Sequence, residues 1–449
     1  MRKLFLRLIV LVIVISFVTS FILIGCKTAT IATTTAAAET TAAAETTFAE
    51  TTAAETTTAK EVITLNFAND KGWSPTVAGI SPFSEKAIGV AVNSTSYNDP
   101  AEFQALMKQG IMSSESSPDF LNWWSGYRLK DVVDLGGLED VSDIWKKHID
   151  AGEYDPSVAE GFKMSDGKYY GSLFLNNFWT VLYNKHIFDE LNLKEPQTWE
   201  EFIKVCDTIK ASGRTPIDSY IEGKWYSLAW FEEILIRTDP ALYEGVSDFS
   251  IKYSDPRVVN ALKTWTGMIE KGYFPEELQV PIADLFKNFV TGDAPMLLIG
   301  DWAMSNIEAL DFHQGVDYDA FIVPMINPEA EKTIIFETSP IVIPKKSPHL
   351  KETRALFDYW LSPEGQTNWN NTWEGATTNK KAEVTDKPIF NKFKNLGLLS
   401  GDYRYINRFY ENTPVPVCEF ALDKFVEIML NPDRLESALA DIDKFIAAQ

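Results

Sequence analysis

Short apolar runs alternate with amphipathic helical stretches along the chain from Val62 onward. Residues 63–67 (ITLNF) and 296–299 (MLLI) are typical of strands, and 258–271 is typical of a helix with one apolar face. Strands that alternate with helices indicate open, mostly parallel sheets, which bind ligands beside the carboxyl ends of their strands. The sequence has no repeat with a period of about 20–50 residues, so it predicts an α/β fold rather than a solenoid or propeller.

Composition narrows the classes of function. The 449 residues include 41 Lys and Arg against 63 Asp and Glu, a net charge of −22. This charge argues against nucleic acid as a partner, because phosphate binding needs a basic face. Three Cys and four scattered His, without an HExxH pair, predict no metal site. The sequence also has no Walker loop, nucleophile elbow or Gly-rich dinucleotide turn, so we expect no cofactor.

The first residues predict an exported lipoprotein. Arg2 and Lys3 precede an apolar stretch at 8–24, which is almost long enough to span a bilayer, so a transmembrane anchor is the alternative. Residues 23–26 (LIGC) resemble the lipobox of bacterial lipoproteins. The resemblance implies that 1–25 is a signal peptide and that Cys26 is lipidated after cleavage. Acyl chains would then hold the mature protein on the outer face of the cell membrane.

Thr, Ala and Glu make up nearly all of 28–59. The Thr pairs oppose helix formation, and almost no apolar side chain is available for packing. We therefore expect 26–60 to comprise the lipidated Cys26 and a flexible tether with a span of about 30 Å as a coil.

Several segments, taken in order, resemble the family 1 extracellular solute-binding proteins of ABC importers, the carbohydrate-binding group that includes the maltodextrin-binding proteins. They are 166–171 (DGKYYG), 182–185 (LYNK), 198–202 (TWEEF), 291–303 (TGDAPMLLIGDWA), 339–347 (SPIVIPKKS) and 362–366 (SPEGQ). The resemblance implies a type II periplasmic-binding-protein-like fold. Two α/β lobes, each with an open, mostly parallel sheet flanked by helices, would enclose a ligand cleft.

The resemblance also implies how the chain divides. Lobe 1 would hold 61–174 and 339–376, and lobe 2 would hold 178–336 and 378–449. The chain would cross between the lobes near Leu175, Glu337 and Thr377.

The best candidate for ligand binding follows the apolar strand at 296–299. A sugar offers apolar C–H faces that stack on aromatic rings, and hydroxyls that need planar donors and acceptors. Trp302 matches the family position that stacks on sugar. Asp301 would accept hydrogen bonds from hydroxyls, and helix N-capping is its alternative role.

Further candidates lie after other strands. Asn69, Asp70 and Trp73 follow the first strand, where a solvated loop is the alternative. Trp123 and Trp124 occupy the position of a second aromatic platform. Adjacent residues cannot both face inward on one element, so we expect at least one of them in the core and prefer Trp124 for the cleft.

The remaining candidates lie at the crossings and in a loop of lobe 2. Asn177 and Trp179 belong to the first crossing, and Asn177 supplies an amide where some relatives have a carboxylate. Glu222 and Trp225 lie in the loop of lobe 2, which in this family often closes over the ligand. Glu337, Trp373 and Glu374 lie near the other crossings, and a core or hinge role is their alternative.

Cys206 lies on the apolar face of the helix that begins at 199 and is expected to be an inert buried residue. Whether it pairs with Cys418 stays open.

These features predict a monomeric carbohydrate-binding lipoprotein without catalytic activity. It would capture a sugar or oligosaccharide by closure of its lobes, deliver it to the permease subunits of an ABC importer, and contact the membrane through its N-terminal lipid only. A binding protein for a polyol, sugar acid or peptide is the alternative. A secreted glycoside hydrolase, which needs two carboxylates at a defined separation, is a further one.

Overall fold

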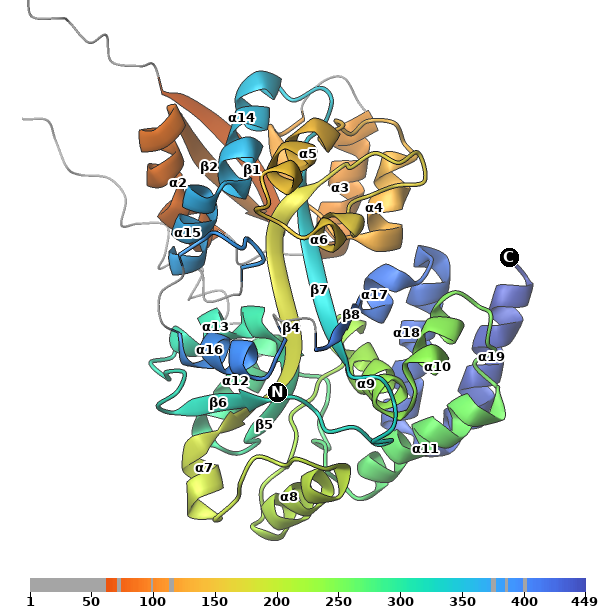
Figure 1. The fold of residues 1–449 in the computed structure, drawn as a ribbon. Coiled ribbons are helices and arrows are strands. Elements are labelled where there is room, and N and C mark those ends of the chain that lie inside the picture. Colours follow the sequence, from red (N-terminus) through yellow and green to blue (C-terminus); the bar gives the residue numbers. More distant parts are fainter. Residues whose placement is uncertain are drawn as a thin grey trace, which may run out of the picture. The chain divides into compact units, whose positions relative to one another are not determined.

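The computed structural model (Figure 1) describes residues 62–70, 74–97, 100–112, 117–372, 377–383, 387–398 and 402–449. These residues belong to one compact unit, Ala59–Gln449. Within them, no helix combines the length and the apolar character needed to cross a membrane. The predicted signal peptide and tether lie outside the described residues.

The strands of the described chain form one connected sheet in the order β2-β1-β3-β7-β4-β5, with β6 beside β4 and β8 beside β7. Their bounds are β1 Ile63–Asp70, β2 Val90–Tyr97, β3 Phe120–Asn122, β4 Ser172–Asn184, β5 Met296–Gly300, β6 Tyr318–Phe321, β7 Thr333–Val342 and β8 Arg404–Ile406. The strands predicted at 63–67 and 296–299 are therefore confirmed.

Two long antiparallel strands, β4 and β7, run through the middle of the sheet (Figure 1). Their register extends from Ser172 opposite Ile341 to Phe178 opposite Phe336. Toward one end β7 pairs with β3, and toward the other end β4 pairs with β5 and β6. The same two strands therefore connect two separate groups of strands.

The predicted α/β class is confirmed, but the prediction of mostly parallel sheets holds only for part of the molecule. β1 pairs in parallel with β2 and β3, and β7 pairs in parallel with β8. All pairs that β4 makes, with β5, β6 and β7, are antiparallel. A repeated strand–helix–strand unit would give parallel neighbours. β4 instead connects the two groups of strands, so its neighbours can be antiparallel.

The buried apolar residues form two clusters. The first core takes its residues from 65–173 and 341–369, and the second core takes its residues from 178–336 and 389–442. Each core therefore draws on two stretches of sequence that lie far apart. Burial of these apolar side chains is the main favourable term in folding, so each cluster stabilises its own group of strands and helices.

Helices cover both groups of strands. Those that bury residues in the first core or neighbour it in sequence are α2 Ser74–Ile88, α3 Pro100–Met112, α4 Gly126–Val133, α5 Ser142–Asp150, α6 Pro156–Glu160, α14 Leu350–Leu361 and α15 Pro363–Thr372. The remaining helices are α7 Lys185–Glu190, α8 Trp199–Ala211, η1 Trp225–Ser227, α9 Leu228–Thr238, α10 Pro240–Ser247, α11 Pro256–Glu270, α12 Ile282–Thr291, η2 Asp301–Ala303, α13 Met304–Glu308, α16 Pro388–Asn395, α17 Phe409–Asn412, α18 Val415–Leu430, η3 Pro432–Arg434 and α19 Leu435–Ala447.

The start of α8 shows how the local sequence determines where a helix begins. The hydroxyl of Thr198 accepts a hydrogen bond from the backbone N–H of Glu201 at 3.2 Å, and the Glu201 carboxylate accepts one from the backbone N–H of Gln197 at 2.7 Å. These reciprocal bonds satisfy N–H groups that the helix leaves unpaired. The helix buries Cys206 as predicted, and Cys206 and Cys418 are both free cysteines.

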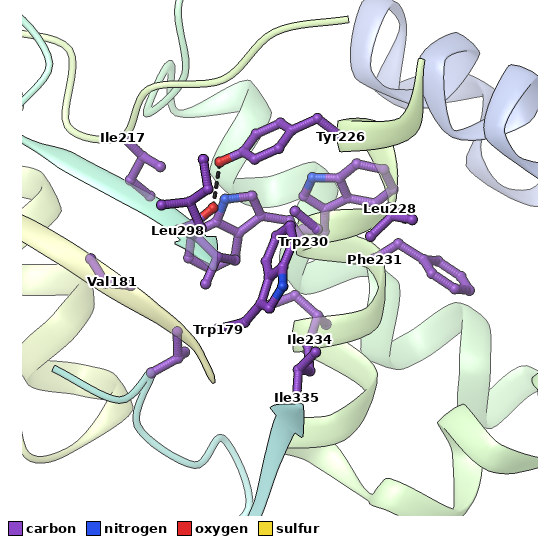
Figure 2. Packing of buried hydrophobic residues seen from close by; sticks show 14 of the residues in the cluster. Trp179, Val181, Ile217, Tyr226, Leu228, Trp230, Phe231, Ile234, Leu298 and Ile335 are labelled. Carbon is purple, nitrogen blue, oxygen red and sulfur yellow. Dashed lines mark hydrogen bonds between the residues drawn. The ribbon is translucent and has the colours of Figure 1, made fainter. Parts of the chain in front are cut away.

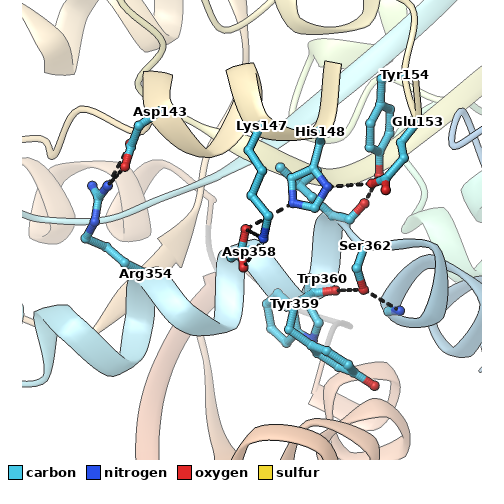
Figure 3. Close-up of polar contacts among 12 residues, drawn as sticks. Asp143, Lys147, His148, Glu153, Tyr154, Arg354, Asp358, Tyr359, Trp360 and Ser362 are labelled. Atoms are coloured by element: carbon cyan, nitrogen blue, oxygen red, sulfur yellow. Dashed lines mark hydrogen bonds and ion pairs between the residues drawn. The ribbon is translucent and has the colours of Figure 1, made fainter. Parts of the chain in front are cut away.

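A buried histidine joins α5 to α14 (Figure 3). His148 Nδ1 lies 2.6 Å from Glu153 Oε2, and its Nε2 lies 3.2 Å from Asp358 Oδ1. Burial acts to lower the pKa of His148, but the two carboxylates outweigh it, so the pKa is raised. His148 and its two carboxylate partners therefore link α5 to α14 beside the first core.

Candidate functional site

Glu337 lies on β7 directly opposite Asn177 on β4. Its Oε2 accepts a hydrogen bond from the Trp179 indole N–H at 3.0 Å, and its Oε1 lies 3.1 Å from Arg408 Nη2. Arg408 also donates from Nε to Glu411 Oε2 at 3.0 Å. The strand register thus brings a carboxylate, an amide and an indole together where β4 and β7 join the two cores.

This charge cluster is almost inaccessible to solvent. Glu337 is 7% exposed, Arg408 is 4% exposed and Glu411 is 1% exposed. Burial raises the pKa of Glu337, and Arg408 opposes that rise. The pKa of Arg408 is also raised, because Glu337 and Glu411 outweigh the effect of burial. A buried guanidinium that is paired with two carboxylates holds them in fixed positions.

Polar atoms of two side chains at this place, Asn177 and Asp301, lack hydrogen-bond partners. Both amide atoms of Asn177 and the Oδ1 atom of Asp301 are buried without a hydrogen bond. Asp301 accepts from the backbone N–H of Phe178, and burial raises its pKa well above the usual value. An unmade buried hydrogen bond costs about 1–3 kcal/mol, so unpartnered buried groups point to a function such as ligand binding. Asp301 does not take the alternative role of helix N-cap, because Gly300 is the N-cap of η2.

Trp302 is partly buried and packs against both the first and the second core. Its ring centre lies 6.2 Å from that of Trp225, which is also partly buried. Gly300 permits this arrangement, since a Cβ there would lie 2.6 Å from Trp302 Cδ1 and 3.1 Å from Trp179 Nε1. Two partly exposed indoles therefore lie together, and one of them, Trp302, directly follows Asp301, whose Oδ1 has no partner.

Trp179 itself belongs to the interior of the second core (Figure 2). It is fully buried, and its ring centre lies 6.4 Å from that of Tyr226. The Tyr226 hydroxyl donates to the carbonyl of Leu298 on β5 at 2.6 Å. Trp179 was predicted to contact ligand, but its packing and its bond to Glu337 give it a supporting position.

The first core contributes Trp124. Trp123 is buried and its indole N–H donates to the carbonyl of Arg128 at 2.8 Å, whereas Trp124 is partly buried. The ring centre of Trp124 lies 6.4 Å from that of Tyr410 on α17. Trp124 is thus the more accessible indole of the pair.

Asn69 and Asp70 are the last two residues of β1 rather than residues of a loop that follows it, and their side chains bond to neighbouring strands of the first core. The Asn69 amide donates to Ser94 Oγ at 2.7 Å and to the carbonyl of Thr95 at 3.1 Å. The carboxylate of Asp70 accepts from the side-chain amide of Asn122 at 2.9 Å. Because both donors of the buried Asn69 amide are used, we do not include Asn69 in the site that we propose.

Of the other candidates, Glu222 is exposed in the loop before η1. Cys26, Trp73, Trp373 and Glu374 lie outside the described residues. Within the part of the chain that the structure describes, no group of three or more His, Cys, Asp and Glu side chains is placed to hold a metal ion.

Comparison with known proteins gives the family. Residues 78–392 match the family model described as bacterial extracellular solute-binding protein. The match spans well over half of the chain. The chain belongs to this family. Because the family is extracellular, the binding protein is exported.

Two curated relatives illustrate the similarity. An uncharacterised ABC transporter extracellular-binding protein of Pyrococcus horikoshii is 23% identical over 59% of the binding protein, and the match covers 59% of that relative's length. The multiple sugar-binding protein of Streptococcus mutans is 24% identical over 65% of the binding protein and 76% of the relative.

A solved structure supports the fold. A bacterial solute receptor with an exclusive preference for β-D-galactopyranose superposes with a TM-score of 0.76 at 18% identity, over 86% of the binding protein and 98% of the receptor. The predicted two-lobed fold is therefore confirmed.

Sequence reasoning missed the residues of the binding protein that follow β8. Arg408, Tyr410 and Glu411 lie in 407–412 (NRFYEN), which carries no periodic pattern. A pair of aromatic residues between two charged ones is the one signal in that stretch. The pairing of Arg408 with Glu337 depends on the tertiary fold, so the sequence alone offers no way to find it.

Proposed function

We propose that this protein is the carbohydrate-binding subunit of an ABC importer. The sugar lies between two lobes, 61–174 with 339–376 and 178–336 with 378–449, and leaves unchanged. The observation that carries the proposal is the position of Trp302, which packs against both cores beside the unpartnered buried groups of Asn177 and Asp301. The names of relatives such as the multiple sugar-binding protein of Streptococcus mutans support it.

Each group has a defined part in this proposal. Trp302, Trp225 and Trp124 present aromatic surface to the C–H faces of a sugar ring. The Asn177 amide both donates to and accepts from hydroxyls, and Asp301 accepts through Oδ1. Glu337 is held by Arg408 and Trp179, which orients it beside Asn177.

Capture follows from the position of these groups. β4 and β7 carry Asn177 and Glu337, and both strands take part in both cores. A sugar that contacts residues of both lobes stabilises the arrangement in which the lobes meet, because only that arrangement offers all contacts at once. This arrangement then docks on the permease subunits as a monomer.

The partners of the Glu337 carboxylate favour binding without catalysis. A glycoside hydrolase needs one carboxylic acid and one carboxylate on either side of the scissile bond. Glu337 has Arg408 on one oxygen and Trp179 on the other, which supports a positioning part rather than that of a nucleophile.

We further propose that the exported protein is a lipoprotein. Cys26 carries the lipid, the segment up to residue 60 is the tether, and the lipid is the protein's contact with the membrane. The support is the LIGC segment after the apolar stretch at 8–24.

A thermal-shift screen with a carbohydrate library, followed by calorimetry, tests the proposal. We expect at least one sugar to bind saturably, and chromatography of the mixture to recover that sugar intact. Cleavage products would favour a hydrolase. Absence of binding by every sugar, together with binding of a peptide or polyol, would favour another solute.

A further inference from the structure

We propose that Glu337 is a positioning residue of the sugar site. It fixes the orientation of the Trp302 indole, so that the ring presents its face rather than its N–H to the sugar. The inference rests on the proposed function and names a further determinant of the same site.

The first ground is the set of donors that the Glu337 carboxylate accepts. Its Oε2 bonds to the Trp179 indole N–H at 3.0 Å, and its Oε1 lies 3.1 Å from Arg408 Nη2. The Trp302 indole N–H is a third hydrogen-bond donor to the same carboxylate. A carboxylate offers about four acceptor positions, so the protein itself occupies most of this group. An indole has a single N–H donor, so the bond to Glu337 leaves Trp302 only its ring for the ligand.

The second ground is the position of the two indole nitrogens. A Cβ on Gly300 would lie 2.6 Å from Trp302 Nε1 and 3.1 Å from Trp179 Nε1. Both nitrogens therefore lie beside the same point of the backbone, although one indole belongs to β4 and the other to η2. The strand register brings Glu337 to this point, since Glu337 on β7 pairs with Asn177, two residues before Trp179. One carboxylate thus serves two indoles that come from separate elements.

The third ground is the rigidity of Glu337 compared with Trp302. Glu337 is 7% exposed, and Arg408, which pairs with it, is 4% exposed and also bonds to Glu411. The Arg408 guanidinium lies 5.4 Å from the centre of the Trp179 ring. Trp302 is only partly buried and belongs to the short helix η2. A bond from a fixed carboxylate preorganises such an indole, and preorganisation lowers the cost of ordering the ring when sugar binds.

A double-mutant cycle tests the inference. The variants are Glu337→Gln, Trp302→Phe, which keeps an aromatic ring but has no N–H, and the two together. Calorimetry uses galactose, cellobiose and raffinose, or the tightest binder of the wider library. We expect Glu337→Gln to weaken binding about tenfold in the presence of Trp302, and to change it about twofold or less in Trp302→Phe. An equal loss in both backgrounds would show that Glu337 acts on the sugar directly, and would overturn the inference while leaving carbohydrate binding intact.

Glu233→Gln is the matched control. Glu233 is a fully buried carboxylate on α9 that pairs with Arg237 at 2.6 Å. Both Gln variants should lower stability, because each leaves a buried guanidinium without one of its charged partners, but only Glu337→Gln should weaken binding. Wild-type affinity in a folded Glu337→Gln protein would reduce Glu337 to a structural role and overturn the inference.

Indole N–H signals in NMR spectra give a second readout that needs no folded Glu337 variant. The signal of Trp302 is assigned by its loss in Trp302→Phe. In the sugar-free wild type we expect this N–H to exchange with deuterium more slowly than that of Trp199, another partly buried indole. Exchange as fast as at Trp199 would overturn the inference. Binding of none of the probes nor of the wider library would overturn the proposed function and the inference with it.

Discussion

The guanidinium of Arg128 lies 3.3 Å from the centre of the Tyr410 ring. Arg128 belongs to α4, which buries Leu129 in the first core, whereas Tyr410 belongs to α17 and packs against the second core. Arg128 also donates from Nε to the Tyr410 carbonyl at 3.2 Å and pairs with Glu419 at 2.6 Å. One buried side chain therefore makes three contacts across the boundary between the cores.

Replacement of Arg128 tests this contact. Arg128→Met keeps an unbranched apolar stem but loses the stacking cation and its hydrogen bonds, so we expect the free energy of unfolding to fall by about 2 kcal/mol. Urea unfolding followed by tryptophan fluorescence measures the change. The control is Arg257→Met, whose exposed pair with Asp255 should contribute little. Equal losses in the two variants would contradict a special role for Arg128.

Removal of the indole at 302 tests the candidate site. Trp302→Ala should weaken sugar binding by about 2–4 kcal/mol, because a partly buried aromatic anchor is lost. Trp199→Ala, a partly buried indole that packs beside Phe202, should leave affinity unchanged. Calorimetry with the sugar found in the library screen compares the two. Wild-type affinity in Trp302→Ala would take this residue out of the site.

Gly300 gives a test that replaces none of the side chains proposed to contact the ligand. In Gly300→Ala the new methyl would lie 2.6 Å from Trp302 Cδ1, so the indole must shift. We expect affinity to fall about tenfold and stability to fall by about 1–3 kcal/mol. Gly267→Ala, in the interior of α11 with open space around its Cβ position, should instead raise stability by a few tenths to about 1 kcal/mol. A Gly300→Ala protein that binds as the wild type does would show that the position of Trp302 is not critical.

The pairing of His148 predicts a pH dependence of stability. The folded-state pKa of His148 is raised, so its contribution is fully present below the unfolded value of about 6.5 and is lost as pH rises through the folded value. Its partner Asp358 has a pKa lowered to about 2, so that contribution is present above the unfolded value of 3.8 and is lost as pH falls toward 2.

Urea unfolding at pH 5.5 and pH 8.5 measures the histidine effect. We expect lower stability at the higher pH in the wild type and a smaller difference between the two pH values in His148→Gln. His186→Gln, at an exposed histidine, should behave as the wild type does. The same difference in His148→Gln would show that another group is responsible.

Cys26 tests the proposed anchor. Cys26→Ala removes the thiol that would receive the lipid, so the protein should move from the membrane fraction to the soluble exported fraction. Cys206→Ala, at a buried free cysteine, should leave the distribution unchanged. Retention of Cys26→Ala in the membrane would favour the transmembrane alternative.

Local patterns in the sequence predicted most of the elements. The start of α8 follows from Thr198 and Glu201, and the apolar runs gave β1 and β5 because backbone pairing and burial act on short stretches. The site could be predicted only in part. Trp302 and Asp301 follow a strand, which is visible in the sequence, whereas Arg408 and Tyr410 reach the site through pairing of distant segments.

Two candidates, Asn69 and Trp179, have protein partners in the structure for a similar reason. Asn69 follows the pattern of a polar residue at a strand end, but the register of β1 against β2 places its amide beside Ser94 and Thr95. Trp179 lies two positions beyond Asn177 on β4, but its ring packs beside Tyr226 in the second core and its N–H bonds to Glu337. Both outcomes depend on which neighbour a strand acquires, and that information is not local.

The strands that join the two halves of this molecule are also the strands that carry Asn177 and Glu337. Because β4 and β7 both connect the halves and carry these side chains, bending of the strands also reorients the side chains. Substitutions of Asn177 or Glu337 should therefore change both the affinity for the ligand and the movement between the two halves. A change of solute specificity during evolution would then also change that movement.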